Sequence, residues 1–258
     1  MGPLADNGVR PQAEWMPSAT VRLYGCLNDF LASSAPPEQV ATFSGSPAVR
    51  DLLESLGPPH VEIELLLIDG EPKPFSSRVN DGARVAAYPA FHGIDVPKEL
   101  LATPPIKDVR FLLDGHLGTL ARNLRLLGFD AEYEQNPADE ALAAASVGRI
   151  LLSRDLGLLK RTAVIHGYFP RSTDPRHQLA EVVRRFELKA LARPFTRCLQ
   201  CNGPLREVSK ASVLASLPPH TAQTQGRFKQ CGACGQVFWA GSHHAKLQKL
   251  VDEVLAGP

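Results

Sequence analysis

Strand and helix patterns alternate strictly through the middle of this chain of 258 residues. Apolar runs such as "VRFLLD" and "RILLSRD" are interleaved with amphipathic stretches such as "LGTLARNLRLLG" and "RHQLAEVVRRFEL". In the first amphipathic stretch, apolar residues at positions 117, 120, 121, 124 and 127 line one helical face, and Gly128 is a natural stop. Because such alternation is typical of a parallel sheet covered by helices, residues 108–192 are predicted to form a small α/β domain.

The segments on either side have different patterns. Residues 18–95 combine the alternating stretch "TVRLYGCLNDFL", a short helix in "SPAVRDLLESLG" and the strands "VEIELLLIDG" and "ARVAAYPAF", which together predict an α+β unit. The remaining boundaries are a flexible tail at 1–17, a proline-rich linker at 96–107, and a cysteine-bearing module with a C-terminal helix at 193–258.

Charge is unevenly distributed along the chain. Residues 1–106 hold 7 Lys/Arg and 13 Asp/Glu, a balance of −6, whereas residues 107–258 hold 21 and 14, a balance of +7. The second part could face a polyanion, or its bases could simply solvate helix faces. No apolar run reaches 18 residues and no signal-peptide pattern opens the chain, so we expect a cytoplasmic protein without a membrane partner.

Three carboxylates follow the predicted strand ends of the α/β domain. Asp114 closes the first strand, Asp155 follows "RILLSR", and Asp139 begins the second helix, with Glu140 beside it. In open parallel sheets, ligands bind beyond the carboxyl ends of the strands, so these side chains are expected at one rim. Clustered carboxylates are ligands for Mg²⁺ or Mn²⁺, which can activate water for attack on a phosphodiester.

Each acid taken singly also has a structural interpretation. Asp114 and Asp155 could cap helices, and Asp139 could be a first-turn acid that suits the helix dipole. Asp174 is expected to cap the last helix of the domain, with Pro175 at the first helical position. The basic residues near the rim could contact phosphates or could be solvated helix positions, and they are Arg122, Arg125, Arg154, Lys160 and Arg161.

Four of the five cysteines form two C-x2-C pairs, separated by 29 residues. Four thiolates in two tight turns suit a closed, structural Zn²⁺ site, and the ligands would be Cys198, Cys201, Cys231 and Cys234. Two disulfides or free thiols are the alternative. Trp239 follows the second pair and could pack under a zinc ribbon or stack on unpaired bases. Cys26 stands alone and is interpreted as a small core residue.

The stretches "FLLDGHLGTLARNLRLLGFDAEY" and "ADEALAAASVGRILLSRDLGLLKR", together with the cysteine module, resemble the mut-7 C-terminal RNase domain, a PIN-like nuclease family. The resemblance spans nearly all of residues 109–250. It implies a metal-dependent nuclease whose acidic cluster corresponds to Asp114, Asp139 and Asp155. PIN domains commonly carry a fourth acid, for which this chain offers Glu140 or Asp174.

The first unit resembles a ubiquitin-like β-grasp domain related to bacterial sulfur carriers, on the residues "VRDLLESLG", "LLLIDGEP" and "VNDGARVAAYP". Sulfur carriers use a free C-terminal Gly-Gly. Here the last strand continues as "YPAFHGIDVPKELL", so sulfur transfer is disfavoured and a docking role for a protein partner is expected.

These observations predict a ribonuclease that cleaves single-stranded RNA with Mg²⁺ or Mn²⁺ and uses a zinc ribbon to hold its substrate. A catalytically inactive RNA-binding or adaptor protein is the main alternative. A phosphatase or phosphoacceptor is a second one, because an Asp at a strand end can also act as a nucleophile.

Overall fold

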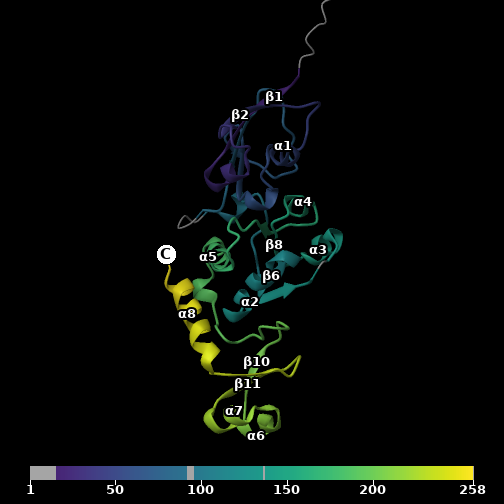
Figure 1. The fold of residues 1–258 in the computed structure, drawn as a ribbon. Helices are drawn as coiled ribbons and strands as arrows, with labels where there is room; N and C mark the ends of the chain where they lie inside the picture. Colours follow the sequence, from purple (N-terminus) through teal and green to yellow (C-terminus); the bar gives the residue numbers. More distant parts are fainter. Residues whose placement is uncertain (1–15, 92–95, 136, 258) are drawn as a thin grey trace, which may run out of the picture.

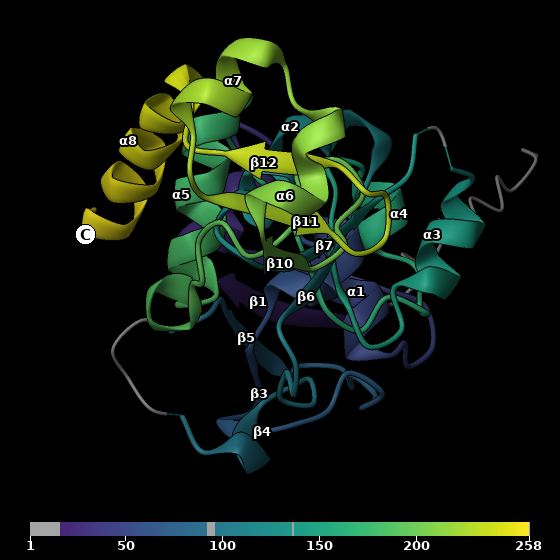
Figure 2. The ribbon, with the colours of Figure 1, turned by 90° about the horizontal axis from the view of Figure 1, so that it is seen from below.

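The computed structural model describes residues 16–91, 96–135 and 137–257, so nearly all of the predicted tail at 1–17 lies outside the described residues. Three units follow one another in chain order, each with its own sheet (Figure 1). We call them the β-grasp unit, the parallel-sheet unit and the ribbon unit. Seen from below, the ribbon unit lies in front of the other two (Figure 2). None of the described helices is long and apolar enough to cross a membrane.

The β-grasp unit is a five-stranded mixed sheet in the order β2-β1-β5-β3-β4. Its central pair, β1 and β5, is parallel, and the other pairs are antiparallel. Helix α1 buries Val49, Leu52 and Leu53 against the apolar face of the sheet. The elements are β1 (Ser18–Leu23), β2 (Glu38–Thr42), α1 (Val49–Leu56), β3 (Leu65–Ile68), β4 (Glu71–Pro72), β5 (Arg84–Tyr88), and the 3-10 turns η1 (Gly25–Phe30), η2 (His60–Glu62) and η3 (Lys98–Leu100).

The parallel-sheet unit confirms the α/β prediction: its four strands lie in the order β7-β6-β8-β9 and all pairs are parallel. β6 is the first strand of this unit; the second, β7, lies on one side of it and the third, β8, on the other. The strand order therefore reverses between β6 and β8. The elements are β6 (Arg110–Leu113), η4 (Gly115–Leu117), α2 (Gly118–Leu126), β7 (Asp130–Tyr133), α3 (Asp139–Ala145), β8 (Ile150–Leu152), α4 (Leu156–Leu159), β9 (Gly167–Tyr168), α5 (Pro175–Arg185) and η5 (Leu188–Leu191).

Helices cover both faces of this sheet because its strands are apolar on both sides. Phe111 and Leu113 pack with α2 and α5, whereas Leu112 and Leu151 pack with α3 and α4. Gly128 follows the C-cap of α2 and adopts φ +93°, and a Cβ there would lie 2.1 Å from the carbonyl oxygen of Arg193. Glycine is therefore the residue that this turn can accommodate.

The ribbon unit is a three-stranded antiparallel sheet in the order β10-β11-β12. Three short helices between β10 and β11 form the excursion expected there and cover one face of this sheet. The last helix, α8, instead packs Val251 into the core of the parallel-sheet unit beside α5 (Figure 1). The elements are β10 (Leu205–Val208), α6 (Lys210–Val213), η6 (Leu214–Ser216), α7 (Pro219–Thr224), β11 (Phe228–Cys231), β12 (Val237–Trp239) and α8 (Ser242–Ala256).

The strand predicted for "VEIELLLIDG" is half wrong. Its second half is β3, but His60–Glu62 form the 3-10 turn η2, which leaves the β-grasp sheet and contacts β9. The apolar pattern of this segment is real because Val61 and Ile63 are buried, but Val61 belongs to a core of the parallel-sheet unit. Burial at a domain interface and burial in a strand give the same local pattern.

A buried ion pair joins η2 to the end of β9. Glu62 is 1% exposed, and its carboxylate accepts bonds from Arg171 Nη1 at 2.9 and 3.0 Å and from the Phe169 N–H at 2.7 Å. Burial raises the pKa of Glu62, while the charge of Arg171 and the Phe169 N–H oppose that shift. The buried carboxylate of Glu62 therefore needs Arg171 and the Phe169 N–H, and these contacts dock the β-grasp unit on the parallel-sheet unit.

We predict that Glu62→Ala lowers the free energy of unfolding by roughly 2–4 kcal/mol, because it leaves the part-buried guanidinium of Arg171 without its carboxylate. Urea denaturation followed by circular dichroism measures this change. Glu38→Ala is the matched control, since its ion pair with Arg22 is half exposed and is worth at most about 0.5 kcal/mol. Equal effects of the two variants would contradict the assignment.

Candidate functional site

Asp114 lies at the carboxyl end of β6, beside the point where the strand order reverses. It occupies the N-cap position of η4, but its side chain makes no capping hydrogen bond. Instead, its Oδ2 accepts a 2.7 Å bond from the hydroxyl of Ser153, the first residue after β8. The carboxylate thus bonds the residue after the neighbouring strand and does not cap the helix.

Ser153 also ties Asp114 to Asp155. Its hydroxyl oxygen accepts the Asp155 N–H at 2.9 Å, and the serine is fully buried. Asp155 is the N-cap of α4, and its Oδ1 accepts the Leu158 N–H at 3.1 Å. The capping interpretation of Asp155 therefore holds for one of its oxygens. Sequence reasoning missed Ser153. The signal that could have found it is its place as a polar residue directly after an apolar strand, at the same end of the sheet as Asp114.

Asp139 and Glu140 begin α3 and face a base rather than the other acids. Arg161 lies 3.7 Å from Asp139 Oδ2 and 3.9 Å from Glu140 Oε1, and the Glu140 side chain is 89% exposed. In the part of the chain that the structure describes, no three carboxylates of the rim lie within 4.8 Å of one another. Asp114 and Asp155 are thus linked through Ser153, whereas Asp139 pairs with Arg161.

The fourth-acid candidate Asp174 has a capping role. Its Oδ1 accepts the N–H groups of Arg176 and His177 at the start of α5, with Pro175 at the first helical position, as expected. These bonds lower the pKa of Asp174.

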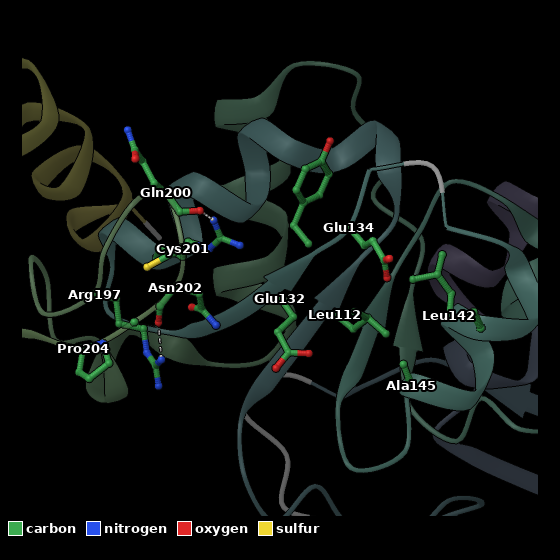
Figure 3. A pocket seen from close by; sticks show the side chains of 14 residues that line it. Leu112, Glu132, Glu134, Leu142, Ala145, Arg197, Gln200, Cys201, Asn202 and Pro204 are labelled. Atoms are coloured by element: carbon green, nitrogen blue, oxygen red, sulfur yellow. Dashed lines mark hydrogen bonds between the residues drawn. The ribbon is translucent and has the colours of Figure 1, made fainter. Parts of the chain in front are cut away.

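A cavity of about 540 Å³ lies beside the rim, between β7, α3 and the first cysteine pair (Figure 3). Glu132 and Glu134 lie between Arg197 and Asn202 on one side and Leu142 and Ala145 on the other (Figure 3). The cavity thus presents acidic, basic and apolar side chains.

Tyr133 connects this cavity to the acidic rim. Its ring lines the cavity, and its hydroxyl donates a 3.0 Å bond to the carbonyl of Gly115, next to Asp114. A Cβ on Gly118 would lie 2.9 Å from the tyrosine ring, so the small residue at the start of α2 allows this contact. Nothing in the sequence pattern singles out Tyr133.

Three basic side chains expected to meet phosphates are used inside the protein. Arg125 is 7% exposed and donates from Nε to a carbonyl of β7 at 2.8 Å. Arg154 Nη1 donates to the carbonyls of residues 170–172 at 2.7–3.1 Å, and Lys160 Nζ donates to the Glu54 carbonyl at 2.6 Å. These bonds satisfy backbone acceptors, which is a different role from the one predicted.

Of the remaining predicted bases, Arg122 is exposed on α2, and Arg161 is engaged with Asp139 and Glu140. Trp239 packs against the small apolar core that the excursion forms on the ribbon sheet, and its side chain stays partly exposed. Phosphate contacts by Arg122 and Arg161 and base stacking by Trp239 remain predictions.

Polar side chains join the free edge of β7 to the ribbon unit. The Ala131 N–H donates to Asn202 Oδ1 at 3.0 Å, and the Ala131 carbonyl accepts from Arg125, whose Nη1 also bonds the carbonyls of residues 199 and 200. Asp130 accepts from Arg149 and from Asn202 Nδ2, both at 2.8 Å. This network fixes the first cysteine pair against the sheet.

We predict that Asp130 stabilises the protein near neutral pH and loses this effect in acid. Burial opposes its ionisation, but the bonds from Arg149 and Asn202 and the charge of Arg197 outweigh burial and lower the pKa of Asp130. Since the folded pKa is depressed, the stabilisation is present above the unfolded value of about 3.9 and falls as pH drops below it. Asp130→Asn should therefore cost about 1–2 kcal/mol at pH 7 and much less at pH 3.

Urea denaturation of both proteins at the two pH values tests this prediction. The control is Glu207→Gln at an exposed position of β10, for which the cost should be small at both pH values. A cost for Asp130→Asn that does not vary with pH would contradict it.

The four cysteines of the C-x2-C pairs converge from two similar turns. The Asn202 N–H donates to the Cys198 carbonyl at 3.1 Å, and the Gly235 N–H donates to the Cys231 carbonyl at 3.0 Å. Asn202 (φ 66°) and Gly235 (φ 74°) are both left-handed, so the first turn uses an asparagine where the second uses a glycine. That asparagine also supplies the contacts to β7.

The sulfur atoms fit a tetrahedral zinc site. All four lie within 4.8 Å of one another, with Cys198–Cys234 at 3.7 Å and Cys201–Cys231 at 3.4 Å. A tetrahedron with Zn–S bonds of about 2.3 Å has edges of about 3.8 Å. A Cβ on Gly203 would lie 2.9 Å from the Cys231 sulfur, so glycine leaves room for the cluster.

Hydrogen bonds favour thiolate formation at one of these cysteines. Burial raises the pKa of Cys231, but the backbone N–H groups of Cys234 and Ala233 and the neighbouring thiols lower it to about 7. A thiolate is the form that binds metal.

We predict that the purified protein holds one Zn²⁺ per chain and that Cys198→Ala or Cys231→Ala removes it. Elemental analysis after gel filtration measures the content. Cys26→Ser is the matched control because this fifth cysteine lies in η1 of the β-grasp unit, outside the cluster, where it is exposed and not the core residue expected. Zinc retained by both cluster variants would refute the four-thiolate site.

Two family models match this chain. One, described as the Mut7-C RNAse domain, covers residues 109–251, and the other, described as Mut7-C ubiquitin, covers residues 16–95. No match was found among the curated proteins or the solved structures.

Proposed function

Because this chain belongs to the Mut7-C RNAse domain family, we propose that it is a ribonuclease that hydrolyses phosphodiester bonds of single-stranded RNA at the acidic rim. The observation that carries the proposal is the link from Asp114 through Ser153 to Asp155 at the reversal of strand order. Open α/β sheets bind ligands at this position.

In this proposal, Asp114 and Asp155 are the principal acids, and Asp139, which pairs with Arg161 in this structure, would be the third residue to hold the metal. Their oxygens are hard ligands, and such sets suit Mg²⁺ or Mn²⁺. When bound, either ion would supply Lewis-acid activation of water and neutralise charge on the phosphate. Glu140 remains the candidate for a fourth acid, since Asp174 uses its carboxylate as a helix cap.

The groups of the chain would divide the remaining tasks. Ser153 donates to Asp114 and thereby fixes the direction of one carboxylate oxygen. Arg122 on the exposed face of α2 and Arg161 would contact the phosphate backbone. With the pair between them released, Arg161 would be free to contact the substrate and Asp139 would be free to hold the metal.

The cavity beside Tyr133 is the proposed path for unpaired bases toward the rim. It adjoins Gly115, the residue after Asp114, and it combines apolar and polar lining groups. Base faces can pack on apolar side chains, and their edges can bond carboxylate and amide groups. The ribbon unit forms one wall of this cavity, which supports its proposed part in holding RNA.

We expect the purified protein to cleave end-labelled single-stranded RNA with Mn²⁺ or Mg²⁺ and not with EDTA. Asp114→Asn and Asp155→Asn should each lower the cleavage rate at least about 100-fold, since each removes a charged group from the reaction centre. Gel analysis of the products gives the rate, and product lengths separate endonucleolytic from exonucleolytic action.

Asp108→Asn is the matched control, because Asp108 precedes β6 and therefore lies at the opposite end of the sheet, where it is 73% exposed. It should leave the rate unchanged. Salt-dependent RNA binding without cleavage under any metal would favour the alternative of an RNA-binding protein, for which the Asp139–Arg161 ion pair would be the resting arrangement of the site.

A further inference from the structure

The segment that carries Asp155 is too short to hold its own shape. It runs from Ser153 to Lys160 and contains the cap Asp155 and the four-residue helix α4 (Leu156–Leu159). Isolated helices shorter than about 12 residues are marginal in water. Its conformation therefore depends on contacts made by its two ends and by its apolar face. Several of those contacts come from the β-grasp unit.

The C-terminal end of α4 is clamped by α1. Arg50 Nη2 donates to the Lys160 carbonyl at 2.6 Å, and Lys160 Nζ donates to the Glu54 carbonyl at 2.6 Å. The two bonds run in opposite directions between the same elements, so they restrain both the backbone and the side chain at the end of the helix. Arg50 is itself held by Glu54, at 3.4 Å.

The loop after α4 is held from the same side. His60 of η2 lies between Glu54 Oε1, at 2.6 Å from Nδ1, and the Val164 carbonyl, at 2.8 Å from Nε2. Val61, the next residue, packs in one apolar cluster with Leu158 of α4. The β-grasp unit thus supplies part of the core beneath this short helix.

The residue before Asp155 is restrained by a second route. Arg154 Nη1 bonds the carbonyls of residues 170–172, and Arg171 within that loop is held by the buried carboxylate of Glu62. Glu62 belongs to η2 of the β-grasp unit. Residues on both sides of Asp155, Arg154 and Lys160, are therefore connected to that unit.

From this juxtaposition we propose that the β-grasp unit acts within its own chain as a positioning element for the nuclease site. Arg50, Glu54 and Glu62 are positioning residues that hold the Ser153–Lys160 segment, and with it the carboxylate of Asp155, in the arrangement that cleavage requires. The inference rests on the proposed ribonuclease activity. It assigns to the ubiquitin-like domain a task that needs no separate protein partner.

The test compares Arg50→Gln with Arg22→Gln in the full chain. Arg50→Gln removes the donor to the Lys160 carbonyl. Arg22→Gln removes an arginine from β1 of the same unit, where it forms a half-exposed ion pair with Glu38. We expect Arg50→Gln to lower kcat for RNA cleavage about 10- to 100-fold with KM changed less than about twofold, since misplacement of a reacting group affects the chemical step. Arg50→Lys should recover part of the loss, and Arg22→Gln should equal the wild type.

Hydrogen–deuterium exchange gives a readout that needs no activity. In Arg50→Gln, peptides covering residues 155–160 should exchange about fivefold faster, while peptides covering β1 and β5 keep their wild-type rates because the β-grasp unit stays folded. Wild-type exchange at 155–160 in Arg50→Gln, or faster exchange with an unchanged kcat, would overturn the inference. A wild-type protein that cuts no RNA, with faster exchange confined to residues 155–160 in Arg50→Gln, would overturn the proposed function and leave the mechanical link standing.

Discussion

A parallel sheet of four strands has two open edges, and the arrangement of this protein follows from how each edge is closed. On β7, the Ala131 N–H and carbonyl are bonded by Asn202 and Arg125, which belong to the link with the ribbon unit. On β9, the Phe169 N–H that follows the strand is bonded by Glu62 of the β-grasp unit. Unpaired edge groups invite pairing with other chains. The two flanking units thus complete the parallel-sheet unit, and the rim of carboxylates lies between them.

The cysteine cluster and the proposed acidic site differ in how their geometry is fixed. Each cysteine pair lies within one tight turn, so only two turns must meet, and the Asn202 and Arg125 contacts bring the first of them to the sheet. The rim acids come from three separate segments, and like charges repel until a cation is present. Ser153 bridges two of them, whereas Arg161 neutralises the third. Among the described residues, the thiol cluster is accordingly preformed in the fold, whereas the three rim acids do not form one cluster.

The sequence predicted those features that depend on local periodicity and spacing. The alternation of strands and helices, the burial of Leu120 and Leu124 in α2, the stop at Gly128 and the convergence of the cysteine pairs are confirmed. Features set by contacts between distant residues were missed. "VEIE" has a strand-like pattern, but Val61 is buried by Leu151 of β8 and the leucines of α4 rather than in the β-grasp sheet. Ser153 and Asn202 are ordinary polar residues in the sequence, and their roles arise from partners 39 and 71 residues away.

The same long-range contacts change the meaning of the charge asymmetry. The balance of −6 in residues 1–106 and +7 in residues 107–258 left two interpretations open, a basic surface for a polyanion or bases that solvate helix faces. In the folded chain, however, Glu62 and Asp29 pair with Arg171, and Glu64 pairs with Arg185. Lys160 and Arg154 meanwhile bond backbone carbonyls at the same interface and beside it. Part of the opposite charge of the two halves therefore holds them together. Arg171 and Arg185 pair with acidic residues of the β-grasp unit in their own chain.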